Sequence, residues 1–174
     1  KVSPVLGITT AYTTRVGSGP FPTAVEDDTG EFLRSEGGEF GATTGRPRRC
    51  GWFDAVLVRQ AVCLNGISSL ALTKLDVLDK FEEIRIAVAY QLADGTTTKS
   101  FPTLQLDKVT PIYKTMPGWK RSSRGIQQVD ELPKELIAYI KLLEDLVSAP
   151  VSIISTGPRR EETILLPSAP LIST

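Results

Sequence analysis

The sequence contains no histidine, and it has only one methionine and two cysteines among 174 residues. Histidine is the side chain whose ordinary pKa lies closest to neutrality, so acid–base chemistry at that pH would require another residue or another segment. No cluster of Cys, His or paired carboxylates has the spacing of a metal site. The sequence therefore predicts neither a catalytic acid or base nor metal ligands within this chain.

Long apolar runs and an excess of charge of one sign are also absent. No run approaches the roughly 18 apolar residues that cross a bilayer. Twenty basic residues balance twenty acidic ones, which argues against a nucleic-acid or membrane-surface partner. The N-terminus lacks both a starting methionine and the apolar region of a signal peptide, which favours a chain cut from something longer.

The composition is otherwise that of an ordinary soluble globular domain. Apolar residues make up 41% of the chain and charged residues 23%. Cys50 and Cys63 fall near the start and in the interior of a predicted helix. We therefore expect two reduced, cytosolic thiols, although their spacing alone leaves a disulfide open.

The pattern of apolar residues predicts an α/β fold. Strands are predicted at 5–14, 70–76, 84–92, 151–154 and 163–166, helices at 53–65 and 133–147, and a surface excursion or short helix within 24–41. Asp94-Gly95 predicts a hairpin turn, residues 102–117 an irregular or short-strand excursion, and residues 167–174 a frayed end. Together they indicate a mainly parallel sheet flanked by helices, with a β-hairpin excursion.

The stretch from Gly41 to Trp52, GATTGRPRRCGW, concentrates two threonines, several glycines and three arginines. Arginine binds carboxylates and phosphates bidentately, and threonine hydroxyls and the backbone N–H groups near Gly45 can bind further oxygens. The helix predicted to follow would present its positive N-terminal end to the same anion. An anion-binding loop is favoured; the alternative is a solvated basic turn.

The predicted strand at 70–76 ends in polar residues, among them Lys74 and Asp76. A fixed carboxylate can accept two hydrogen bonds from N1–H and the exocyclic amine of guanine, whereas adenine offers no such donor pair. The Lys74 stem could cover the plane of the base. The alternative is a strand end that Asp76 caps before a turn.

These motifs together resemble adenylosuccinate synthetase, the enzyme that joins IMP and aspartate with hydrolysis of GTP. The resemblance includes AYTTRVGSGPFPT at 11–23, LTKLDVLD at 72–79, TMPGW at 115–119 and ISTGP at 154–158, in the order of the family and over nearly the whole chain. It implies that residues 1–174 are the C-terminal portion of a P-loop-NTPase-like synthetase fold. The phosphate-binding loop, the catalytic acid and base and the Mg²⁺ ligands of the family would all precede this region.

The resemblance also implies a set of binding residues. Aspartate and IMP would contact Ala42, Thr43, Thr44, Gly45, Arg46, Pro47, Arg48 and Val16, and GTP would contact Arg48, Lys74, Leu75, Asp76, Ser155, Thr156 and Gly157. Within this set, Arg46 would bind the aspartate carboxylate and the IMP ribose, and Arg48 would bridge aspartate and GTP. One position departs from the family pattern, because Arg159 stands where an aspartate usually follows the proline.

For the whole enzyme the resemblance implies a cytoplasmic homodimeric ligase of purine biosynthesis that uses GTP and Mg²⁺. This chain alone is expected to be inactive, since the catalytic part would precede it. Two other hypotheses stay open. The chain could be a stand-alone, non-catalytic guanine-nucleotide-binding module, or a subunit that contributes loops in trans to a separately encoded N-terminal half.

Overall fold

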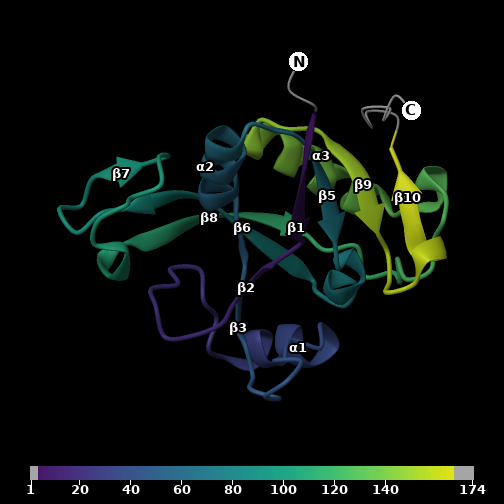
Figure 1. The fold of residues 1–174 in the computed structure, drawn as a ribbon, viewed down its shortest axis with the longest axis horizontal. Coiled ribbons are helices and arrows are strands. Elements are labelled where there is room, and N and C mark those ends of the chain that lie inside the picture. The colour runs from purple at the N-terminus through teal and green to yellow at the C-terminus, as the bar shows by residue number, and fades with distance from the viewer. Residues whose placement is uncertain (1–3, 167–174) are drawn as a thin grey trace.

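The computed structural model describes residues 4–166, so the frayed end predicted at 167–174 lies outside the described residues. Its central sheet has the order β1-β5-β9-β10 (Figure 1). These strands are β1 (Val5–Thr10), β5 (Ile67–Thr73), β9 (Val151–Ser155) and β10 (Thr163–Leu165). β1 and β9 both pair with β5 in parallel, and β10 pairs antiparallel with β9. The predicted α/β class with a mainly parallel sheet is confirmed.

β1 lies at one edge of this sheet and exposes apolar side chains. Ile8 is 78% exposed, and Val5 and Leu6 are 38% and 44% exposed. Within residues 4–166 the backbone of β1 pairs only with β5.

Three α-helices occur in residues 4–166: α1 (Asp28–Glu36), α2 (Ala55–Asn65) and α3 (Lys134–Val147). They lie within the predicted segments. Asp54 caps α2 by accepting a hydrogen bond from the Leu57 N–H at 3.0 Å, and Gly66 ends it with a left-handed φ of 59°. None of these helices is both long and apolar enough to span a bilayer.

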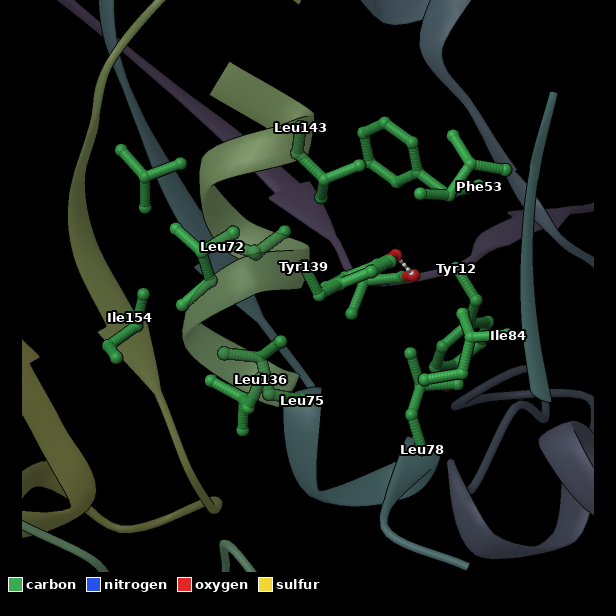
Figure 2. Close-up of a cluster of buried hydrophobic side chains, with 14 of the residues drawn as sticks. Tyr12, Phe53, Leu72, Leu75, Leu78, Ile84, Leu136, Tyr139, Leu143 and Ile154 are labelled. Carbon is green, nitrogen blue, oxygen red and sulfur yellow. Dashed lines mark hydrogen bonds between the residues drawn. The ribbon is translucent and has the colours of Figure 1, made fainter. Parts of the chain in front are cut away.

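The core forms between α3 and the central sheet. Leu136, Tyr139 and Leu143 lie on the buried face of α3, opposite Leu72 of β5 and Ile154 of β9 (Figure 2). The Tyr139 hydroxyl donates to the Ala11 carbonyl at 2.7 Å, which satisfies its polar atom in the apolar interior.

A second sheet contains the predicted hairpin. β6 (Glu83–Gln91) pairs in parallel with β4 (Phe53–Asp54) and antiparallel with β7 (Thr97–Thr98) and β8 (Thr110–Pro117). The β6–β8 ribbon ends in an arm that carries β7 away from the central sheet (Figure 1). The hairpin turn predicted at Asp94-Gly95 is confirmed.

Two segments differ in extent from the prediction. Residues 102–117, predicted as an irregular or short-strand excursion, include the eight-residue strand β8 despite Pro111 and Pro117. β8 pairs only with β6 in the described part of the chain, and an edge strand tolerates prolines because its outer N–H groups need no partner. The strand predicted at 70–76 ends instead at Thr73, because Lys74 adopts a left-handed φ of 62° and residues 75–78 form a 3₁₀ turn.

The predicted strand at 5–14 is interrupted. β1 ends at Thr10, and the chain continues as β2 (Thr13–Arg15), which pairs antiparallel with β3 (Arg49–Gly51). Cys50 therefore lies in β3 and not at a helix start. Cys50 is buried and Cys63 exposed, and both are free thiols, as expected. Burial raises the pKa of Cys50 to about 11.

The α3–sheet interface should dominate stability. Leu136 is fully buried, so Leu136→Ala should lower the free energy of unfolding by about 2–5 kcal/mol. The matched control is Leu64→Ala on α2, where the side chain is 73% exposed and the change should stay within about 0.5 kcal/mol. Urea denaturation followed by circular dichroism measures both, and equal losses would contradict the packing described here.

Candidate functional site

The stretch from Gly41 to Trp52, called the arginine loop below, is anchored on the buried carboxylate of Glu39. Glu39 is 1% exposed. One oxygen, Oε1, accepts hydrogen bonds from Tyr12 Oη at 2.7 Å and Lys74 Nζ at 2.6 Å. The other, Oε2, accepts from Thr14 Oγ1 at 3.3 Å and Arg48 Nη1 at 3.0 Å. Glu39 thus joins Lys74, which the resemblance assigns to GTP, to Arg48, which it assigns to both aspartate and GTP.

Lys74 is held in place by more than this ion pair. Its Nζ also donates to the Gly37 carbonyl, at the C-terminal end of α1, at 2.7 Å. The left-handed backbone at Lys74 lets the chain leave β5 while its side chain reaches Glu39. The side chains of Lys74 and Arg48 remain 35% and 34% exposed, so both keep contact with solvent.

The segment from Gly41 to Pro47 forms a small closed loop. The Gly41 N–H donates to the Arg46 carbonyl and the Gly45 N–H to the Gly41 carbonyl, each at 2.8 Å. Thr44 Oγ1 accepts from the Arg46 N–H at 3.3 Å. The exposed side chains of Thr43 and Arg46 have no hydrogen-bond partner within residues 4–166. The loop thus offers one hydroxyl and one guanidinium to an anion.

The expected contribution of a helix N-terminus to this loop is wrong. β3, which begins at Arg49, and β4 lie between Arg46, Arg48 and the start of α2 in the chain. The start of α2 is capped by Asp54, which is 2% exposed and also accepts a hydrogen bond from Tyr90. The N-terminus of α2 is therefore already occupied by a carboxylate of the chain itself.

Val16 lies beside the arginine loop through strand pairing. Arg15 is opposite Arg49 in the β2–β3 pair, and Val16 follows directly. Arg49 Nη2 donates to the carbonyls of Gly17 at 2.6 Å and Gly19 at 2.5 Å, so this third arginine holds the neighbouring loop in place. Val16 itself is 74% exposed.

Asp76 lines a cavity of about 470 Å³ next to the end of β5, with Arg124 among its other lining residues. Burial raises the pKa of Asp76, the positive charge of Arg124 opposes that shift, and Asp79 adds to it. Leu75, which precedes Asp76, is fully buried in the core. The whole residue, backbone included, is inaccessible, so Leu75 presents no surface to a ligand in this structure.

Asp79 fixes the opposite wall of this cavity. Its carboxylate accepts hydrogen bonds from Trp119 Nε1 and Ser123 Oγ, each at 2.7 Å, and from the Ser123 N–H at 2.8 Å. Trp119, which follows the end of β8, is 5% exposed and therefore buried. Arg124, the next residue after Ser123, is thereby held close to Asp76.

The loop after β9 uses most of its polar groups internally. Thr156 Oγ1 donates to the Ile126 carbonyl at 2.9 Å, and the Thr156 N–H donates to the Glu162 carbonyl at 2.9 Å. Ser155 Oγ donates to the Gly157 carbonyl at 2.7 Å. The Gly157 N–H, in contrast, has no partner within the described part of the chain. It is the group of this loop that a ligand could use.

The loop after β9 and the end of β5 lie close together. Leu72 of β5 pairs with Ile154 of β9, so the two strands end side by side. A Cβ added to Gly157 would come within 2.5 Å of Glu162 Oε2, and the charge of Glu162 also acts on Asp76. The structure thus connects the arginine loop to Lys74 through Glu39, and the β5–β9 pairing brings the ends of these two strands, with Asp76 and Gly157 beyond them, to the same edge of the sheet.

The departure at Arg159 leaves this loop intact. The Arg159 N–H donates to Glu162 Oε2 at 2.7 Å, and its carbonyl accepts from the Glu162 N–H at 3.1 Å. These are backbone contacts, and the Arg159 side chain is exposed. The loop conformation therefore does not depend on an aspartate at this position.

The comparisons with known proteins agree with the motifs. A family model described as adenylosuccinate synthetase matches residues 1–164.

The chain belongs to the adenylosuccinate synthetase family.

Among its relatives, the adenylosuccinate synthetases of Psychrobacter sp. (strain PRwf-1) and Pseudomonas aeruginosa (strain LESB58) are 58% identical over 162 residues and 56% identical over 168 residues. Each match covers 93% of this chain and 38% of the relative. A solved structure of fully ligated adenylosuccinate synthetase from Plasmodium falciparum is 36% identical with a TM-score of 0.90, and the match covers 95% of this chain and 40% of that one. The chain therefore spans about two-fifths of the length of these family members.

Sequence reasoning missed Glu39 and Asp79. Glu39 lies two residues before Gly41, outside the part of the adenylosuccinate synthetase motif that was quoted, and Asp79 is the last residue of LTKLDVLD. The residues adjacent to Glu39 and Asp79 in the sequence do not reveal these roles, because hydrogen-bond donors to both carboxylates come from distant segments. The signal available in the sequence was an acidic residue, Glu39, just before a motif with three arginines.

The Glu39 ion pairs should make stability depend on pH. Burial alone would raise the pKa of Glu39, but hydrogen bonds from Lys74, Tyr12 and Arg48 hold it below its ordinary value. Such a carboxyl stabilises the fold above its unfolded pKa of about 4.3, and that stability is lost as pH falls through the folded pKa. Glu39→Gln should therefore be less stable at pH 7 and lose less stability on acidification.

Urea denaturation at several pH values between neutrality and acid measures this difference. Glu135→Gln removes the same charge at an exposed position of α3 and should follow the unsubstituted chain. An acid-induced loss in Glu39→Gln as large as in the unsubstituted chain would contradict the assignment.

Proposed function

We propose that residues 1–174 are the C-terminal portion of an adenylosuccinate synthetase and supply its aspartate-, IMP- and guanine-binding elements. The whole enzyme would be a ligase of purine biosynthesis that forms adenylosuccinate from IMP and L-aspartate with hydrolysis of GTP. The observation that carries this proposal is the connection of Arg48 and Lys74 through one buried carboxylate, in a chain of this family.

The arginine loop is suited to a dicarboxylic acid. Thr43 and Arg46 present a hydroxyl and a guanidinium without internal partners, and Arg48 keeps donors beyond the one bound to Glu39. Arginine pairs with a carboxylate through two parallel hydrogen bonds. In this proposal Ala42–Arg48 bind aspartate, Arg46 also contacts the IMP ribose, and Val16 lines the same side.

The ends of β5 and β9 are suited to guanine. Asp76 would accept from N1–H and the exocyclic amine, the free Gly157 N–H would donate to the 6-oxygen, and the Lys74 stem would cover the base. Ser155 and Thr156 would shape this pocket through the internal hydrogen bonds that fix their loop. Arg48 would then act between the two ligands, since it shares Glu39 with Lys74.

Other parts of the reaction fall outside this chain in the proposal. The phosphate-binding loop, the catalytic acid and base and the Mg²⁺ ligands would come from the N-terminal portion of the enzyme, which would act as a cytoplasmic homodimer. Within residues 4–166 no group of three His, Cys, Asp or Glu side chains could hold a metal ion. The proposed role of the residues in this chain is binding and charge stabilisation.

A chimera tests the proposal directly. This chain would replace the matching C-terminal part of the Psychrobacter relative, which is 58% identical. We expect the chimera to form adenylosuccinate from IMP, aspartate and GTP, and the purified 174-residue chain to form none, because positioning groups alone do not supply the acid and base.

The unaltered relative is the positive control, and the absorbance change of product formation is the readout. Activity of the chain alone would refute its assignment as a binding portion. A folded but inactive chimera, together with guanine-nucleotide binding by the chain alone, would favour the stand-alone module.

Guanine selection provides a second test. Asp76→Asn replaces one acceptor oxygen with an amide that donates, so it opposes the guanine amine. In the chimera we expect the KM for GTP to rise about 10- to 100-fold, with a much smaller effect on the KM for aspartate. Asp107→Asn, at an exposed position outside the site, is the matched control and should change neither value. An unchanged KM for GTP in Asp76→Asn would remove Asp76 from the pocket.

A further inference from the structure

We propose that Glu39 is a positioning residue that couples the aspartate loop to the guanine-binding end of β5, so that the charge available to one ligand depends on the cation at the other site. This inference rests on the proposed function of those two elements. It concerns a residue to which neither the motifs nor the proposed ligand contacts assign a role.

The contacts divide evenly between the two carboxylate oxygens. Oε1 binds the guanine-side cation Lys74 together with the Tyr12 hydroxyl, and Oε2 binds the aspartate-side cation Arg48 together with Thr14. Each oxygen therefore serves one element, and the two hydroxyl groups fix the orientation of the carboxylate. A rotation that improved one ion pair would weaken the other.

The charges of Glu39, Arg48 and Lys74 determine how much positive charge remains for ligands. Two cations share one carboxylate, so the cluster of Glu39, Arg48 and Lys74 carries a net positive charge. Glu39 is 1% exposed, and solvent screens interactions at such a site only weakly. The buried Nε of Arg48 has no hydrogen-bond partner within the described residues, so Glu39 does not saturate this guanidinium.

Removing the charge of either Lys74 or Arg48 should change how strongly the remaining cation attracts a ligand. Without the Lys74 charge, Glu39 would compensate Arg48 alone, and Arg48 would attract a ligand carboxylate less strongly. Without Arg48, the same argument applies to Lys74. Such coupling is reciprocal for binding free energies. Thr14 and Tyr12 carry no charge. Their contacts account for the orientation of the carboxylate, but not for the coupling between Lys74 and Arg48.

The experiment uses Lys74→Met in the chimera described above, with KM measured for each substrate. Loss of a guanine contact alone would raise only the KM for GTP. Coupling through Glu39 predicts that the KM for aspartate also rises, by about five- to tenfold. In a Glu39→Gln background, Lys74→Met should leave the KM for aspartate unchanged, because the connecting charge is gone. Lys134→Met, at an exposed position of α3, is the control.

Two further measurements keep the inference testable if Glu39→Gln does not fold or if the chimera is inactive. In the first case, the double variant Lys74→Met/Arg48→Met should raise the KM for aspartate by much less than the product of the two single effects. If the chimera is inactive, the proposed function fails, and NMR of the 174-residue chain tests the coupling between Lys74 and Arg48 instead. The Arg48 Nε–H resonance should shift in Lys74→Met and stay in place in Lys134→Met.

An unchanged KM for aspartate in Lys74→Met, independent effects in the double variant, or an unmoved Arg48 resonance would each overturn the coupling. Glu39 would then be a structural support of the fold only. A purely structural role predicts lower stability in Glu39→Gln but no dependence of one ligand on the cation of the other.

Discussion

A single buried charge organises this molecule. An ionised carboxylate in a protein interior is strongly destabilising unless cations and hydrogen bonds compensate it. Glu39 meets that requirement with partners from β2, the residue after β5, the arginine loop and the segment after β1. If any of these partners moved away, the charge would lose its compensation inside the protein. Glu39 therefore fixes the relative positions of elements that belong to different sheets and loops.

Much of the fold could be predicted from the sequence because its signals are local. The apolar stripe of α3 and the cap and left-handed glycine of α2 predict those helices within a residue or two. Features that depend on distant pairing could not be predicted. β8 contains two prolines and is a strand only because β6 lies beside it, and β5 ends early because Lys74 bends towards Glu39.

The site shows the same division. The family motifs predicted which segments carry candidate ligand contacts, and the structure connects those segments. The motifs did not show that Thr156 turns its hydroxyl towards the protein or that Arg49 holds a neighbouring loop. Each of these facts depends on a partner that is far away in the sequence, so composition and spacing contain no trace of it.

The uncovered strand β1 has a practical consequence. Its outer backbone groups and the exposed Ile8 side chain form a template on which another copy of the strand could add. Association between copies at high concentration is therefore a hazard for this polypeptide. Its solutions should be kept dilute, and a lysine on that strand would act as a gatekeeper against stacking into fibres.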